Sequence, residues 1–92
     1  MTLDRILSLL ESAIEDYHVR DRWDAPCPPA YKPGTMDQAW YAKAWIDTVQ
    51  WHLEDEVRRR DLPSDQLMEI KRRIDALNQE RTDAVEALDL RL

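Results

Sequence analysis

Two histidines and their neighbouring carboxylates are the residues of this sequence best suited to chemistry. Glu15 and His18 form an E-x-x-H pair, which in helical bundles binds iron when a second such pair and two further glutamates are present. The sequence around His52 does not repeat the motif, so no metal and no other cofactor are expected. His52 and Asp55 are three residues apart, and a carboxylate at that spacing can orient an imidazole for acid–base work. Neighbours of this kind occur in any helix, so they alone do not indicate catalysis.

Arg81 interrupts the apolar stripe of the last third of the chain, between Leu77 and Leu88 and close to Asn78. A buried guanidinium without a partner is too costly, so we expect Arg81 to pair with a carboxylate or to reach water. The candidate carboxylates are Asp21, Asp47, Glu54 and Asp55. The alternative is that Arg81 binds an anion such as a phosphate or carboxylate. The candidate polar cluster comprises His18, Asp21, Asp47, His52, Glu54, Asp55, Asn78 and Arg81.

Three helices are expected to position these residues in one all-α domain, residues 1–92. Charged residues make up 35% of the chain and there is a single glycine, which favours helices over a sheet that needs turn glycines. Apolar residues at helical spacing predict helices over 2–20, 36–60 and 65–90. Only a few residues separate the last two helices, so they should form a long antiparallel hairpin, with the first helix packed along it.

A proline-rich linker over residues 21–34 is expected between the first two helices, because its four prolines forbid a regular helix. Trp23 and Tyr31 are its expected anchors onto the helices. Thr2 can cap the first helix, and Thr35 with Gln38 has the spacing of a capping box at the start of the second.

The second helix carries apolar residues on two faces, although packing against one core needs only one. The face expected in the core comprises Ala42, Trp45, Ile46, Val49, Leu53 and Val57. Trp40, Ala44 and Trp51 lie nearly opposite and form a candidate interface. The linker could fold over them, or a second copy or another protein could cover them; a ligand-stacking site is a further alternative. We expect self-association, with a dimer as the first choice.

The overall charge and the lack of long apolar runs exclude several classes of function. A net charge of −6 disfavours nucleic acid, whose binding depends on neutralising phosphates. There is no run of 18 apolar residues, so no membrane span is expected. Cys27 is the single cysteine, which predicts a free thiol and a cytoplasmic location.

Two segments together resemble a known family. They are Ile46-Asp47-Thr48-Val49-Gln50-Trp51-His52-Leu53-Glu54-Asp55 and Lys71-Arg72-Arg73-Ile74-Asp75-Ala76-Leu77-Asn78-Gln79-Glu80-Arg81-Thr82-Asp83, and Asp16-Tyr17-His18 is a weaker third match. They resemble a bacterial domain-of-unknown-function family, number four-two-five-four, over most of residues 10–90. The resemblance implies a helical protein without established catalytic residues, whose genes often lie near glycosyltransferases of envelope polysaccharide synthesis. Because relatives usually continue into a second helical portion, the resemblance also implies that this chain is either a short relative or a separately made first half.

Two functions follow as hypotheses. The first is a non-enzymatic helical interaction module, self-associating and accessory to cell-envelope glycan synthesis, with a glycosyltransferase as a possible partner. The second is a small binding domain or enzyme for an anionic, phosphorylated metabolite, which would use Arg81, His52 and Asp55. Convergence of these side chains in one water-filled cleft would favour the second hypothesis.

Overall fold

The computed structural model describes residues 2–23, 25–59 and 61–89, and within them it has three helices and no strand. The helices are α1 (Leu3–Arg20), α2 (Met36–Arg59) and α3 (Ser64–Asp89), so the all-α prediction is confirmed. α3 begins one residue earlier than expected. The expected last residues of the second and third helices, 60 and 90, lie outside the described residues.

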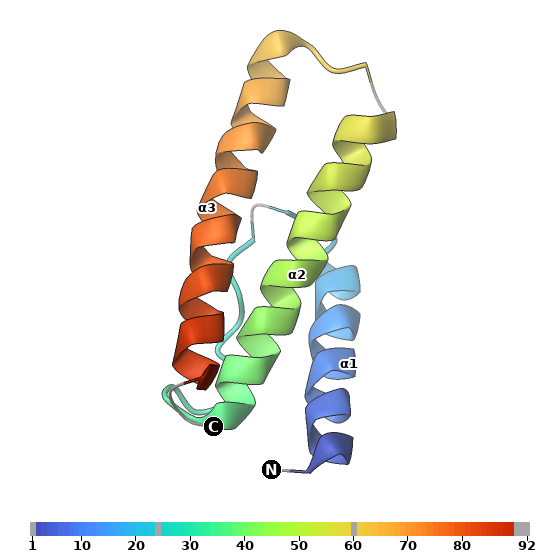
Figure 1. Ribbon diagram of the computed structural model, residues 1–92. Coiled ribbons are helices and arrows are strands. Elements are labelled where there is room, and N and C mark those ends of the chain that lie inside the picture. Colours follow the sequence, from blue (N-terminus) through green and yellow to red (C-terminus); the bar gives the residue numbers. More distant parts are fainter. Residues whose placement is uncertain (1, 24, 60, 90–92) are drawn as a thin grey trace.

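α2 is the central helix of a layer in which α1 and α3 are the outer members. α1 runs parallel to α2 and α3 runs antiparallel to it, as Figure 1 shows. Both outer helices contact α2, and in the described part of the chain they do not contact each other. The expected hairpin of the last two helices is therefore present, and the first helix packs along one side of it.

Capping side chains define where α1 and α2 begin. The Oγ1 atom of Thr2 accepts a hydrogen bond from the backbone N–H of Arg5 at 3.2 Å, and the Oγ1 atom of Thr35 accepts one from Gln38 at 3.2 Å. The capping box is only half formed, because the Gln38 side chain binds the linker instead. Its Oε1 accepts from the Tyr31 N–H at 2.9 Å, and its Nε2 donates to the Pro28 carbonyl at 3.2 Å.

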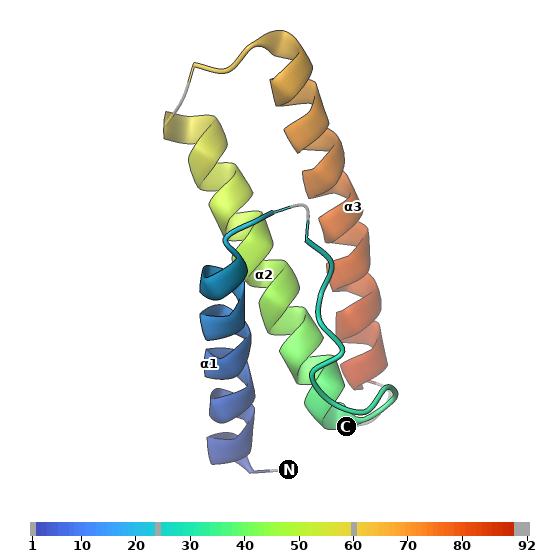
Figure 2. The ribbon, with the colours of Figure 1, turned by 180° about the vertical axis from the view of Figure 1, so that it is seen from behind.

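The linker covers one side of the helical layer, where Figure 2 shows it running back from the end of α1 to the start of α2. Trp23 and Tyr31 pack against the core as predicted, together with Ala25 and Cys27. The Tyr31 ring meets the Tyr41 ring edge to face at 5.6 Å. The linker thus covers the core on this side of the layer.

The core is built mostly from α2, because this helix is packed on several sides at once. Its buried residues are Tyr41, Ala44, Trp45, Ile46, Val49 and Leu53. α1 contributes Ala13 and Tyr17 to the same cluster, and α3 contributes Ile70 and Leu77. Two assignments from the sequence need correction. Ala44 is only 6% exposed and cannot belong to a free interface, whereas Ala42, expected in the core, is only half-buried.

Candidate functional site

Arg81 pairs with one of its expected carboxylates, Asp47, and the pair bridges α3 to α2. The Nε atom of Arg81 donates to Oδ1 of Asp47 at 2.9 Å, and Lys43 Nζ donates to Oδ2 of the same carboxylate at 2.6 Å. The Arg81 and Asp47 side chains are 50% and 37% exposed. Although Arg81 interrupts an apolar stripe, its ion pair is therefore on the surface.

Asn78 forms a second polar bridge between the same two helices. Its Oδ1 accepts a hydrogen bond from Nε2 of Gln50 on α2. Asn78 and Arg81 line one shallow cavity of about 500 Å³, together with Thr82, Val85 and Glu86. Asn78 and Arg81, two members of the candidate polar cluster, therefore both connect α3 to α2.

The two histidines meet across the α1–α2 contact, which the sequence did not indicate. The His52 ring stacks on Tyr17 with centroids 4.9 Å apart and meets the His18 ring edge to face at 5.3 Å. His18 Nδ1 lies 2.8 Å from the Ile14 carbonyl, which can only accept, so Nδ1 carries the proton. His52 Nε2 is buried and has no hydrogen-bond partner among the described residues.

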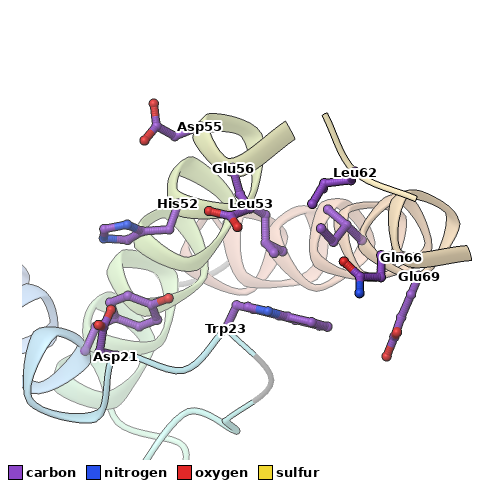
Figure 3. A pocket seen from close by; sticks show the side chains of 11 residues that line it. Asp21, Trp23, His52, Leu53, Asp55, Glu56, Leu62, Gln66 and Glu69 are labelled. Atoms are coloured by element: carbon purple, nitrogen blue, oxygen red, sulfur yellow. The ribbon is translucent and has the colours of Figure 1, made fainter. Parts of the chain in front are cut away.

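His52 also lines a cleft where the end of α1, the end of α2 and the start of α3 approach one another (Figure 3). The cleft encloses about 440 Å³ and is lined by Tyr17, Asp21, Trp23, His52, Leu53, Asp55, Glu56, Leu62, Gln66, Glu69 and Ile70. Asp21 is the residue after α1, held in the left-handed region with φ 47°, and its N–H donates to the Tyr17 carbonyl at 2.7 Å. In Figure 3 the Asp55 carboxylate lies at the rim, far from Trp23.

The candidate polar cluster is thus divided between separate places. His52, Asp55 and Asp21 line the cleft of Figure 3, whereas Asn78 and Arg81 line the cavity on α3. Glu54 is exposed, and neither cavity includes it. His52 and Asp55 therefore do not converge with Arg81, the third residue of the hypothesis of an anionic metabolite. In the described residues, no three His, Cys, Asp or Glu side chains are grouped so that they could hold a metal ion.

Trp51 is the most exposed aromatic residue that the structure describes in α2, at 62%. The linker does not cover it. Trp51 instead borders a hollow of about 290 Å³ between α1 and α2, which is mostly apolar and is also lined by Ile14, His18, Asp47, Thr48 and His52. Trp40, the other tryptophan of the candidate interface, is half-buried.

α1 extends this apolar surface. Ile14 is 43% exposed, Leu7 is 47% exposed and Leu3 is 69% exposed. At 100° per residue these three positions fall within about 40° of one another, so they form one stripe along α1. We call the surface formed by Leu3, Leu7, Ile14 and Trp51 the Trp51 face.

A hydrogen bond between Tyr41 and Asp16 was not anticipated from the sequence. The Tyr41 hydroxyl donates to Oδ2 of Asp16 at 2.6 Å and joins α2 to α1. Burial, and then this hydrogen bond, raise the pKa of Tyr41 above its ordinary value. The only sequence signal was an acidic residue beside the apolar stripe of the first helix, and many solvated carboxylates share that position.

A comparison with family models finds a match to the family described as "Protein of unknown function (DUF4254)", over residues 37–92. The match includes both long segments that carry the resemblance, and it leaves Asp16-Tyr17-His18 outside. No curated protein and no solved structure matches the chain. No helix in the described residues is both long and apolar enough to cross a membrane.

Proposed function

The chain belongs to the DUF4254 family, and we propose that it is a non-enzymatic helical interaction module that pairs with a second copy of itself through the Trp51 face. The observation that carries the proposal is the 62% exposure of Trp51 beside an apolar hollow. Tryptophan is the residue most often found at the energetic centre of protein interfaces, because its large ring buries much area at little cost in side-chain entropy.

The layered architecture supports a second copy as the occupant. The linker covers one side of the three-helix layer, and the Trp51 face lies on the α1–α2 surface that the linker leaves open. Stable domains usually bury the apolar side of one layer against a second layer. Two copies placed face to face would supply that second layer, and a two-fold axis would bring the same residues into contact from each chain.

The size of the molecule is sufficient for such a pair. The chain measures 44 × 26 × 19 Å, so its broad side has enough area for a dimer that buries about 800 Å² on each partner. Exposed apolar patches of a few hundred Å² mark association sites in soluble proteins.

Sedimentation equilibrium at micromolar concentration tests the proposal. The parent chain should sediment as a dimer, and Trp51→Asp should give a monomer with an unchanged helical circular dichroism spectrum. Leu7→Asp, on the other helix of the face, should have the same effect. Met68→Asp is the matched control, because Met68 is 56% exposed on α3 and does not belong to the face. A parent chain of monomer mass contradicts the proposal, and so does a dimer that survives both substitutions.

The alternative function, recognition of an anionic metabolite through Arg81, His52 and Asp55, has less support. Arg81 is already paired with Asp47 and lines a different cavity from the other two residues.

We place the module in the bacterial cytoplasm, on the basis of the family resemblance and of the free Cys27. An accessory role beside an envelope glycosyltransferase rests on the resemblance alone. The test of this accessory role is whether a purified glycosyltransferase, encoded next to the gene for this chain, binds the parent chain.

A further inference from the structure

We propose that the hollow beside Trp51 receives the Trp51 indole of a second copy of the chain, so that the two copies interlock. This inference rests on the pairing proposed above and specifies the contact at its centre. The hollow encloses about 290 Å³ between α1 and α2 and is lined by Ile14, His18, Asp47, Thr48, Trp51 and His52. The Trp51 face therefore carries a recess next to a projecting ring.

Trp51 does not fill the hollow of its own chain. It is 62% exposed, and its ring meets the His52 ring edge to face with centroids 5.1 Å apart. The indole thus stands at the border of the hollow and projects from the surface. None of the described linker residues lines the hollow, so the ring and the recess are both open to a partner.

The walls of the hollow are held in place before a partner binds. His52 stacks on the buried Tyr17 ring, with centroids 4.9 Å apart. His18 and Thr48 each donate a side-chain hydrogen bond to the backbone carbonyl four residues earlier, at 2.8 Å and 2.7 Å. Because these contacts restrict the side chains in the free chain, a partner that enters the hollow loses little affinity to their ordering.

The lining of the hollow suits an aromatic ring with one polar edge. The surface is mostly apolar, and its two imidazole rings favour edge or offset contacts with another aromatic ring. A charged group would lose water against such a surface, whereas an indole can bury its carbon atoms and keep its N–H at the open rim. The volume is near about 300 Å³, the lower limit for pockets that hold small organic molecules, so it suits a single ring system.

Two-fold symmetry allows both copies to make this contact at once. In a symmetric dimer the same surface of each chain meets its equivalent. An axis that passes midway between Trp51 and the hollow it borders places each indole over the hollow of the other chain. The exposed leucines of the Trp51 face, Leu3 and Leu7, then lie beside the interlock and can exclude water from it.

Complementation between two variants tests the interlock. Trp51→Ala removes the indole and keeps the other five lining residues, whereas Thr48→Leu keeps the indole and fills the hollow. Each variant alone should form dimers at least tenfold more weakly than the parent. An equimolar mixture should associate at least tenfold more tightly than either variant alone, because Trp51 of the Thr48→Leu chain can enter the open hollow of the Trp51→Ala chain. Sedimentation equilibrium measures the association, and circular dichroism checks that each variant folds.

Thr82→Leu is the matched control. Thr82 also donates from Oγ1 to the carbonyl four residues earlier, at 2.9 Å, but it lies on α3 outside the hollow, so this variant should dimerise like the parent. If Thr48→Leu does not fold, Ile14→Phe fills the hollow from α1, where Ile14 is 43% exposed.

Two results overturn the interlock while leaving the proposed pairing in place, provided that the parent is a dimer and Trp51→Asp is a monomer. The first is a mixture that associates no more tightly than the separate variants, as expected if the two Trp51 rings only stack on each other. The second is a chain with a filled hollow that dimerises as tightly as the parent. A monomeric parent contradicts the pairing itself, and the interlock with it.

Discussion

Arg81 on α3 donates from Nε to Oδ1 of Asp47 on α2 at 2.9 Å, and the pair stands on the surface of the helical hairpin. Both side chains keep more than a third of their area exposed to solvent. Water screens the attraction between the charges and offers each an alternative partner when the other is lost. The bridge therefore orients the two helices but contributes little to the stability of the fold.

Arg81→Met should lower the free energy of unfolding by less than about 1 kcal/mol, as is usual for an exposed pair. A buried pair would lose about 3–5 kcal/mol on the same change, because a carboxylate would be left unpaired in the core. Urea unfolding followed by circular dichroism measures the difference. Arg72→Met is the control for loss of an exposed arginine from the same helix. A loss above about 2 kcal/mol for Arg81→Met alone would show that the pair is effectively desolvated.

The place of Arg81 shows where helical periodicity reaches its limit. Spacing alone put Arg81 inside an apolar stripe, between Leu77 and Leu88, and both leucines are indeed buried. α3 packs against α2 but not against α1, so only a narrow strip of α3 is covered. A residue at the edge of that strip reaches solvent. The width of the strip depends on how many neighbours a helix has, and the sequence of one helix does not contain that information.

The same limit applies to α1. Helical spacing puts Leu3, Leu7 and Ile14 on one stripe with the buried Ala13, yet these three residues are exposed, whereas Leu9 lies outside that spacing and is 0% exposed. Apolar residues occur on several sides of α1, and packing against α2 determines which of them are buried. Helix bounds, the linker and its anchors were predictable, because capping residues and prolines act locally.

The candidate site was less predictable than the fold, because its contacts join residues far apart in the sequence. His18 and His52 meet across two helices, and the spacing within either helix gives no sign of it. The second hypothesis required His52 to converge with Arg81, and the geometry keeps the two side chains apart. His52 lies on the side of α2 that faces α1, whereas Arg81 reaches α2 from α3.

Tyr41→Phe should change the dependence of stability on alkaline pH. Because the folded state raises the pKa of Tyr41, folding favours the neutral phenol. That contribution to stability is complete below the unfolded pKa of about 10, and it declines as the pH rises above this value. The parent should lose more stability between about pH 9 and pH 11 than the variant, as measured by urea midpoints. At pH 7 the variant should be less stable by about 1–3 kcal/mol, because the hydrogen bond to Asp16 is lost.

Tyr31→Phe is the control for that comparison, since it removes a tyrosine hydroxyl that does not bind Asp16. It should follow the parent across the alkaline range. Identical pH profiles for the parent and Tyr41→Phe would contradict the assignment.

Cys27 should react slowly with thiol reagents while the chain is folded. Burial, and then the Glu80 charge, raise its pKa to about 11 against the opposing effect of Arg20. Only the thiolate reacts, so at pH 8 the folded chain should react about 100-fold more slowly than the chain unfolded in urea. A disulfide-exchange assay measures both rates. Glu80→Gln should speed the folded reaction, and Glu86→Gln, an exposed change elsewhere on α3, should not. Equal rates in the folded and unfolded chains would be incompatible with a buried thiol.

Self-association should strengthen as the salt concentration rises. Each chain carries a net charge of −6, so two copies repel each other at long range, whereas the contact proposed through the Trp51 face is apolar. Salt screens charge over about 10 Å at 0.1 M and over shorter distances at higher concentration, whereas burial of apolar area is not weakened by screening. Sedimentation equilibrium between about 0.05 M and about 0.5 M sodium chloride should show the dimer dissociation constant falling several-fold. Trp51→Asp should remain monomeric throughout, because screening cannot restore the lost apolar contact. A dimer that weakens with salt would indicate an interface of complementary charges, and that result would exclude the Trp51 face as its main source of affinity.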